Sequence, residues 1–157
     1  MVADKFVAMR VKSANWRGVY IDSFAFLEKL IDEYLSRYFC GKDEKLKKDL
    51  MELVLCEKLT FENKRAVFSY VLKNKNIEIV TTYSKLLKDI EIANNNRNVF
   101  AHYMLDTSEY GEKMFEESKL VFVKFSYKDN VVISDEDFLN MHSALQKCIE
   151  ILSSILA

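Results

Sequence analysis

Hydrophobic residues recur at helical spacing along the first half of the chain. Between positions 20 and 38 they lie three or four residues apart, which predicts a long helix with one apolar stripe. The stripe consists of Tyr20, Phe24, Leu27, Ile31, Tyr34, Leu35 and Tyr38. Gly41 follows it, and glycine tolerates the positive φ at which many helices end.

Two shorter helices are expected next. Asp43 and Thr60 are both suited to cap a helix N-terminus, and each precedes a run of spaced apolar residues. The first run is Leu46, Leu50, Leu53 and Val54, and the second is Phe61, Phe68, Val71 and Leu72. The polar stretch 74–76 predicts a turn, after which a fourth helix is expected from about Ile79 to Met104.

The hydrophobic period changes to two after a polar loop that is expected at 105–113. In the segment KLVFVKFSY, alternate residues are predicted to share one face of a strand, namely Val121, Val123, Phe125 and Tyr127. The following KDN predicts a turn and VVI a return strand. Ser134 and Asp137 have the spacing of a capping box, which predicts that the last helix begins there.

These patterns predict a mainly α protein, a helical bundle of about five helices with a small β-hairpin at about residues 119–133 before the last helix. Proline is absent and glycine occurs only three times, and this scarcity of helix breakers favours helices. The 50% of apolar residues suffice for a core. We expect a single domain over residues 1–157. For residues 1–14 a flexible N-terminal arm is the alternative to a place in the bundle.

Composition excludes several classes of protein. The net charge is −1, so the chain has no overall basic character for nucleic acid, although residues 1–18 are locally basic and 106–117 acidic. No apolar run approaches twenty residues, so no membrane span is expected. The three cysteines are odd in number and far apart in sequence, which predicts buried, reduced thiols in a cytoplasmic protein. Trp16 and His142 are interpreted as packing residues, with the alternative that Trp16 and Arg17 stack a base.

The end of the fourth predicted helix interrupts its own apolar stripe with polar residues. Extended at about 100° per residue, the stripe passes through Arg97, which places a guanidinium on a face that should be buried. Beside it runs a polar line of Glu91, Asn95, Asn98 and His102. A buried guanidinium costs several kcal/mol, in the range of about 3 to 5, unless it is paired.

These polar side chains can support metal-free chemistry on RNA. His102 can move a proton near neutral pH, Arg97 can bind a phosphate through two N–H groups, and Asn98 lies one turn before His102. No metal site and no cofactor are expected, because one histidine without clustered ligands cannot hold a metal. Arg97 and His102 lie about 140° apart on one helix, so a two-fold dimer or local unwinding must bring them together. The structural alternative is that Arg97 forms an ion pair and that His102 only closes the helix.

The stretch RNVFAH, residues 97–102, resembles the R-X4-6-H motif of the HEPN superfamily. The resemblance implies a dimeric helical domain that cleaves RNA without metal, as a toxin paired with an antitoxin or as a phage-defence component. Arg97, Asn98 and His102 are then the catalytic residues, with Asn95 and Tyr103 as substrate-binding residues. The same stretch is similar to a segment of the mannitol-operon-repressor family, which implies the alternative of a non-catalytic regulatory or protein-interaction module.

Overall fold

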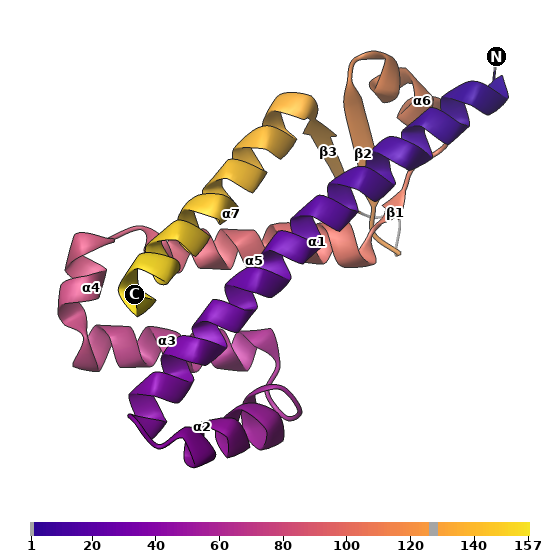
Figure 1. Cartoon of the computed structure of the whole chain (residues 1–157). Helices are drawn as coiled ribbons and strands as arrows, with labels where there is room; N and C mark the ends of the chain where they lie inside the picture. The colour runs from indigo at the N-terminus through magenta and orange to yellow at the C-terminus, as the bar shows by residue number, and fades with distance from the viewer. Residues whose placement is uncertain (1, 126–128) are drawn as a thin grey trace. The chain divides into compact units, whose positions relative to one another are not determined.

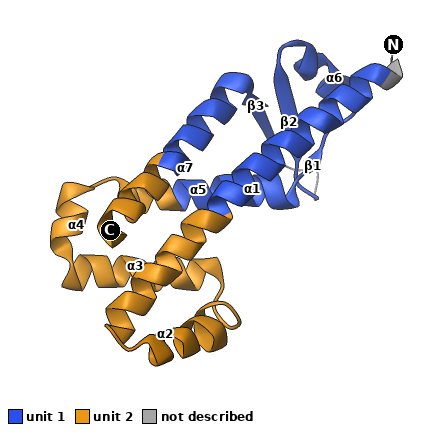
Figure 2. Cartoon of the chain, viewed as in Figure 1, with its two compact units in different colours: residues 1–24, 91–146 blue, residues 25–90, 147–157 orange. Residues whose placement is uncertain are grey.

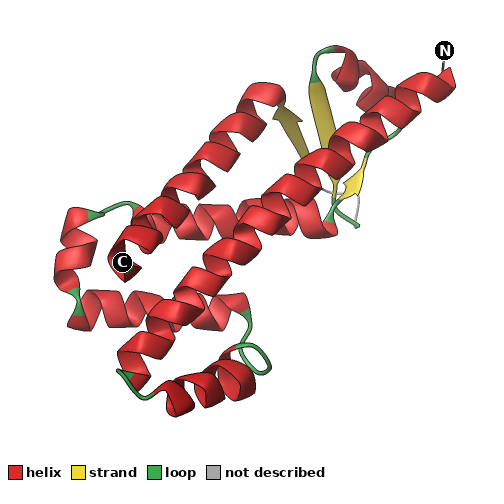
Figure 3. Ribbon diagram, in the orientation of Figure 1, coloured by secondary structure: helices red, strands yellow, loops and turns green. Residues whose placement is uncertain are grey.

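The computed structural model describes residues 2–125 and 129–157, and most of them are helical (Figures 1 and 3). In chain order the elements are α1 (Val2–Cys40), α2 (Glu44–Leu50), the π-helix η1 (Met51–Leu55), α3 (Phe61–Lys75), α4 (Ile77–Thr82), α5 (Leu86–His102), β1 (Met104–Leu105), α6 (Glu109–Glu116), β2 (Lys119–Val123), β3 (Asn130–Ser134) and α7 (Asp135–Leu156). The prediction of a mainly α protein with a β-hairpin before the last helix is confirmed.

The chain forms two compact units, which are coloured separately in Figure 2. Unit 1 comprises residues 1–24 and 91–146, and unit 2 comprises residues 25–90 and 147–157. The helices α1, α5 and α7 each have residues in both units. The candidate site residues all belong to unit 1.

Helix α1 begins at Val2, well before the first stripe residue that the sequence indicates. Residues 2–14 are therefore helical, which corrects the interpretation of this segment as a flexible arm. Met9, Ser13 and Trp16 are buried, and they continue the stripe of Tyr20 towards the N-terminus at intervals of three and four residues. At the other end, Gly41 has a φ of +57° and its N–H binds the Arg37 carbonyl, as expected of a helix terminus.

The predicted caps are confirmed, but the predicted stripe of the second helix is wrong. The Leu46 N–H donates to Asp43 at 3.0 Å and the Asn63 N–H donates to Thr60 at 3.3 Å. Helix α2 has no buried residue, and Leu53 in η1 is 64% exposed. The π-helix adds a residue to the turn, so side chains after it no longer follow the 3.6-residue face of α2. Cys56 is also exposed, which contradicts its expected burial.

The fourth predicted helix is two helices, with a break at residues 83–85. Its first part, Ile79 to Thr82, consists of β-branched residues, which have weak helix propensity. The hydroxyls of Thr81 and Thr82 donate to the carbonyls of Ile77 and Glu78, which are the bonds that bend or end helices. Helix α4 therefore ends at Thr82, and α5 starts separately at Leu86.

A three-stranded antiparallel sheet in the order β1-β2-β3 replaces the simple hairpin. The expected polar loop at 105–113 contains the end of β1 and the start of α6, so that prediction is wrong. Leu120 and Phe122 are buried as well as Val121 and Val123, so both faces of β2 are apolar and the prediction of a single apolar face is wrong. Phe125 is exposed, and Tyr127, like Lys128 of the predicted turn, lies outside the described residues.

Aromatic packing fixes the core of unit 1. Trp16 stacks on Phe138 with ring centres 4.7 Å apart, and Phe100 contacts both Tyr20 and Phe122 at 4.9 and 5.6 Å. The interpretation of Trp16 as a packing residue is confirmed. Helix α7 starts at the predicted capping box, with reciprocal bonds between Ser134 and Asp137, which hold the pKa of the Asp137 carboxyl below its usual value. Within the described residues, no helix is both long enough and apolar enough to span a membrane.

Candidate functional site

Helix α5 carries the candidate residues without any interruption. It is a regular α-helix from Leu86 through the asparagines to His102, so the local unwinding considered above does not occur. Asn98 and His102 are one turn apart on this helix, whereas Arg97 and His102 diverge by about 140°. One chain alone therefore brings Asn98 and His102 to the same side but does not aim Arg97 at His102.

Arg97 is half-buried and lies against neutral groups. Its Nη1 donates to Asn98 Oδ1 at 3.0 Å, and its guanidinium carbon lies 5.6 Å from the centre of the Phe24 ring. No carboxylate of the described residues lies within ion-pair distance of Arg97, so the expected alternative of an ion pair is not found. Asn98 thus orients Arg97 and leaves its positive charge uncompensated.

His102 is the last residue of α5 and is exposed. Its imidazole makes no hydrogen bond to any group in the described part of the chain, so it can reach a molecule in solution.

The two residues predicted to bind substrate have different surroundings. Asn95 is exposed, three positions before Asn98, and shares the polar side of α5 with it. Tyr103 follows the helix and is half-buried, and it lines a hollow beside α1.

Arg17 of α1 is the residue that sequence analysis did not connect to this site. Its guanidinium donates to the carbonyls of Phe100 and Tyr103, at the end of α5, and its Nε donates to Ser13 Oγ at 3.2 Å. It also lies 5.1 Å from the Phe122 ring centre. Burial lowers the pKa of Arg17 from its usual value. The signals in the sequence are the basic character of residues 1–18 and the neighbouring Trp16, with which Arg17 could stack a base.

A groove follows α1 beside the segment that leaves α5. It consists of two adjoining hollows of about 440 and 240 Å³ that share Arg10, Arg17 and Leu105. The other lining residues are Phe6, Ser13, Ala14, Tyr103, Met104 and Thr107. We call this the α1 groove.

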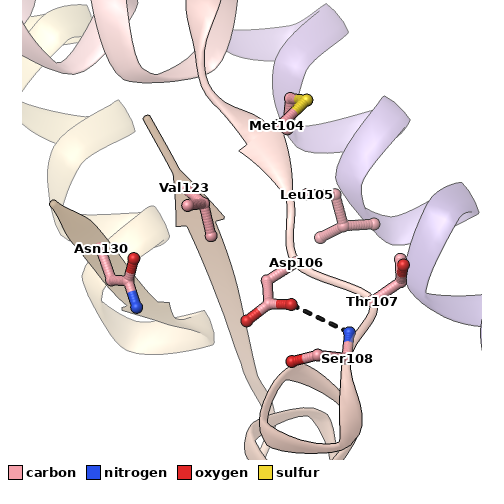
Figure 4. A pocket seen from close by; sticks show the side chains of 7 residues that line it. All are labelled: Met104, Leu105, Asp106, Thr107, Ser108, Val123 and Asn130. Atoms are coloured by element: carbon pink, nitrogen blue, oxygen red, sulfur yellow. Dashed lines mark hydrogen bonds between the residues drawn. The ribbon is translucent and has the colours of Figure 1, made fainter. Parts of the chain in front are cut away.

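A further hollow of about 500 Å³ lies at the same segment, lined by residues 104–108 with Val123 and Asn130 (Figure 4). Figure 4 shows Leu105 and Thr107 beside the ribbon of α1, and Asp106 turned away from it. Asp106 accepts a bond from the Ser108 N–H at 2.9 Å. Gly111 is required nearby, because a Cβ there would lie 2.2 Å from the Asp106 carbonyl oxygen.

Much of the acidic charge of residues 106–117 is compensated. Lys5 Nζ lies 2.6 Å from Glu116 and 3.9 Å from Glu112, and Lys119 Nζ lies 2.9 Å from Glu117. The Lys119 ammonium lowers the pKa of the Glu117 carboxyl. The segment therefore contributes less negative potential near the α1 groove than its sequence indicates.

His142 and the two buried cysteines have structural roles. His142 Nε2 lies 3.2 Å from Ser23 Oγ and 3.1 Å from Gln146 Nε2, and its ring stacks on Phe138, which confirms its interpretation as a packing residue. Cys40 and Cys148 are buried, and burial raises the pKa of the Cys148 thiol to about 11. The described residues contain no group of three or more metal-ligating side chains.

No protein-family model matches the chain, and no curated protein or solved structure matches it either.

Proposed function

We propose that this protein is a metal-independent endoribonuclease of the HEPN type that acts as a homodimer. The observation that carries the proposal is the uncompensated, half-buried charge of Arg97, which Asn98 orients on the helix that also exposes His102. A half-buried guanidinium without a carboxylate favours an anionic ligand, and a phosphate accepts its N–H groups in pairs.

The roles follow from the chemistry of each side chain. Arg97 binds the scissile phosphate and stabilises the negative charge that develops on it, with Asn98 holding the guanidinium in place. His102 accepts the proton of the 2′-hydroxyl, whose oxygen attacks the phosphorus, and returns a proton to the departing 5′-oxygen. The products are a 2′,3′-cyclic phosphate and a 5′-hydroxyl, and these three side chains supply every step without a metal or a cofactor.

A second copy of the chain completes the site. Because α5 is continuous, Arg97 and His102 of one chain point in different directions, and the His102 of one subunit has to approach the Arg97 of the other. A two-fold dimer forms two such sites, each with residues from both subunits.

The test is cleavage of single-stranded RNA in EDTA, with the product ends identified. The wild type is expected to produce cyclic phosphate ends, and Arg97→Ala and His102→Ala each to abolish cleavage while retaining helical circular dichroism. Lys88→Ala, an exposed change on α5, is the charge-matched control. A mixture of the two inactive variants should regain activity. A mixture that stays inactive would reject the composite site. So would a particle of 18.4 kDa in light scattering, which is the mass of one chain.

A regulatory or protein-interaction module is the second candidate. The exposed apolar side chains of α2 and η1, which include Leu46, Leu53 and Val54, favour it, because such residues are suited to contact another protein. A regulatory protein or an antitoxin is the expected partner. In this case the wild type leaves RNA intact, and Leu53→Asp weakens binding of the partner whereas His102→Ala does not.

A further inference from the structure

The α1 groove concentrates positive charge that the described residues do not neutralise. Arg17 directs its three hydrogen bonds to neutral oxygens, and the Arg10 guanidinium lies over the Phe6 ring at 5.4 Å. Neither arginine has a carboxylate within ion-pair distance in the described part of the chain. In contrast, Lys5 and Lys12 on the same helix are both ion-paired, Lys12 with Asp135.

The geometry of α1 aligns these charges with the proposed site. Arg10, Arg17 and Phe24 are seven residues apart, which corresponds to about 10.5 Å of helix rise and a turn of only about 20° between neighbours. Arg97 lies over Phe24. The guanidiniums of Arg10, Arg17 and Arg97 therefore lie in a row along one side of α1, about two helical turns apart. Arg97 is the last of the row.

The groove offers contacts for a nucleotide between these charges. Five N–H donors are present on a guanidinium, and Arg17 uses three of them within the protein, so two are left for a phosphate. Phe6 and Tyr103 supply rings on which a base can stack, and Thr107 supplies a hydroxyl. A half-buried arginine and rings in a narrow groove suit an unpaired strand, because the bases of a duplex are not accessible for stacking.

We propose that the α1 groove binds a single-stranded nucleic acid, with phosphates on Arg10 and Arg17, and guides the strand to Arg97. The proposal rests on the proposed function for the identity of the strand as RNA. It adds a second contact region, in which Arg10 and Arg17 bind substrate without taking part in the chemistry.

The test measures binding separately from cleavage, with the His102→Ala protein and a fluorescein-labelled single-stranded RNA of about twelve nucleotides. Fluorescence anisotropy is recorded at several salt concentrations. Arg10→Ala is expected to weaken binding at least fivefold and to reduce the slope of log K against log salt by about 0.7, the value for one phosphate contact in a single strand. Arg10→Lys should retain most of the slope. Lys73→Ala, an exposed change in unit 2, is the charge-matched control and should change binding less than twofold.

Three results would overturn the proposal. Equal losses of RNA affinity for Arg10→Ala and Lys73→Ala would show general charge attraction. Binding of a duplex of the same sequence as tightly as the single strand would show that the groove does not select an unpaired strand. Absence of binding by the His102→Ala protein would also overturn it. If the strand binds through Arg10 but the wild type never cleaves it, the α1 groove is supported and the proposed nuclease activity is rejected.

Discussion

At the scale of single residues, Arg17 determines how α5 ends. The carbonyls of Phe100 and Tyr103 have no further helical turn to donate to them, and the Arg17 guanidinium binds both. Lysine cannot replace it, because an ammonium lacks the planar fork that reaches two separate oxygens.

Arg17→Ala is therefore expected to lower the free energy of unfolding by about 2 to 4 kcal/mol, since two partly buried carbonyls lose a charged donor. Arg17→Lys should recover less than half of this loss. Urea denaturation measures both variants, with the exposed Arg10→Ala as a control that should stay within about 0.5 kcal/mol of wild type. A loss below about 1 kcal/mol for Arg17→Ala would mean that water can satisfy these carbonyls.

The sequence predicts the candidate residues on α5 better than it predicts their neighbours. Helical periodicity places Arg97 on the apolar stripe and puts Asn98 and His102 together on the polar side, because those relations are local. The contact of Arg17 with Tyr103 joins residues 86 positions apart. Periodicity contains no information on such a pair, so only the packed structure shows that α1 holds the end of α5.

At the scale of elements, α5 remains helical through three asparagines that do not favour a helix. Asn95 is exposed and Asn96 half-exposed, and no hydrogen bond of either side chain is found among the described residues. The propensity cost of these residues is consistent with a helix whose polar side serves a ligand.

Asn95→Ala and Asn96→Ala should each stabilise the protein by about 0.5 kcal/mol, from helix propensity alone. Thermal and urea unfolding of the two variants beside wild type provide the measurement. The two changes should differ in function, since Asn95 is a proposed substrate contact and Asn96 is not. Destabilisation of more than about 1 kcal/mol by both would indicate that the asparagines have a structural role.

Sequence reasoning predicts element ends where a side chain binds the neighbouring backbone. The caps at Asp43, Thr60 and Ser134 are examples, because their effect depends only on residues within three positions. It does not predict β1, whose two residues form a strand only because β2 pairs with them. The π-helix η1 is also not predicted, although it displaces the stripe expected in that region.

At the scale of the whole molecule, unit 2 contains a buried charge cluster on which α3 depends. Lys64 is 3% exposed and donates to Asp32 at 2.8 Å and to Glu28 at 2.7 Å, both on α1. Burial alone would lower the pKa of Lys64, but the two carboxylates raise it, so the ammonium stays charged at neutral pH. Lys64 donates to Asp32 Oδ2, whereas Asp32 Oδ1 is buried and has no hydrogen-bond donor among the described residues, so the carboxylate depends on Lys64.

Lys64→Ala is expected to cost about 3 to 5 kcal/mol, because it leaves the buried Asp32 carboxylate without a cation. The helices α1, α5 and α7 each have residues in both units, so we expect the two units to unfold in one transition. Trp16, the only tryptophan, belongs to unit 1 and reports on that unit through its fluorescence, whereas far-ultraviolet circular dichroism reports on all helices. In urea, Lys64→Ala should shift both signals to the same lower midpoint. A fluorescence midpoint that stays at the wild-type value would show that unit 1 folds independently, and the α1 groove could then be tested on unit 1 without the stability of unit 2.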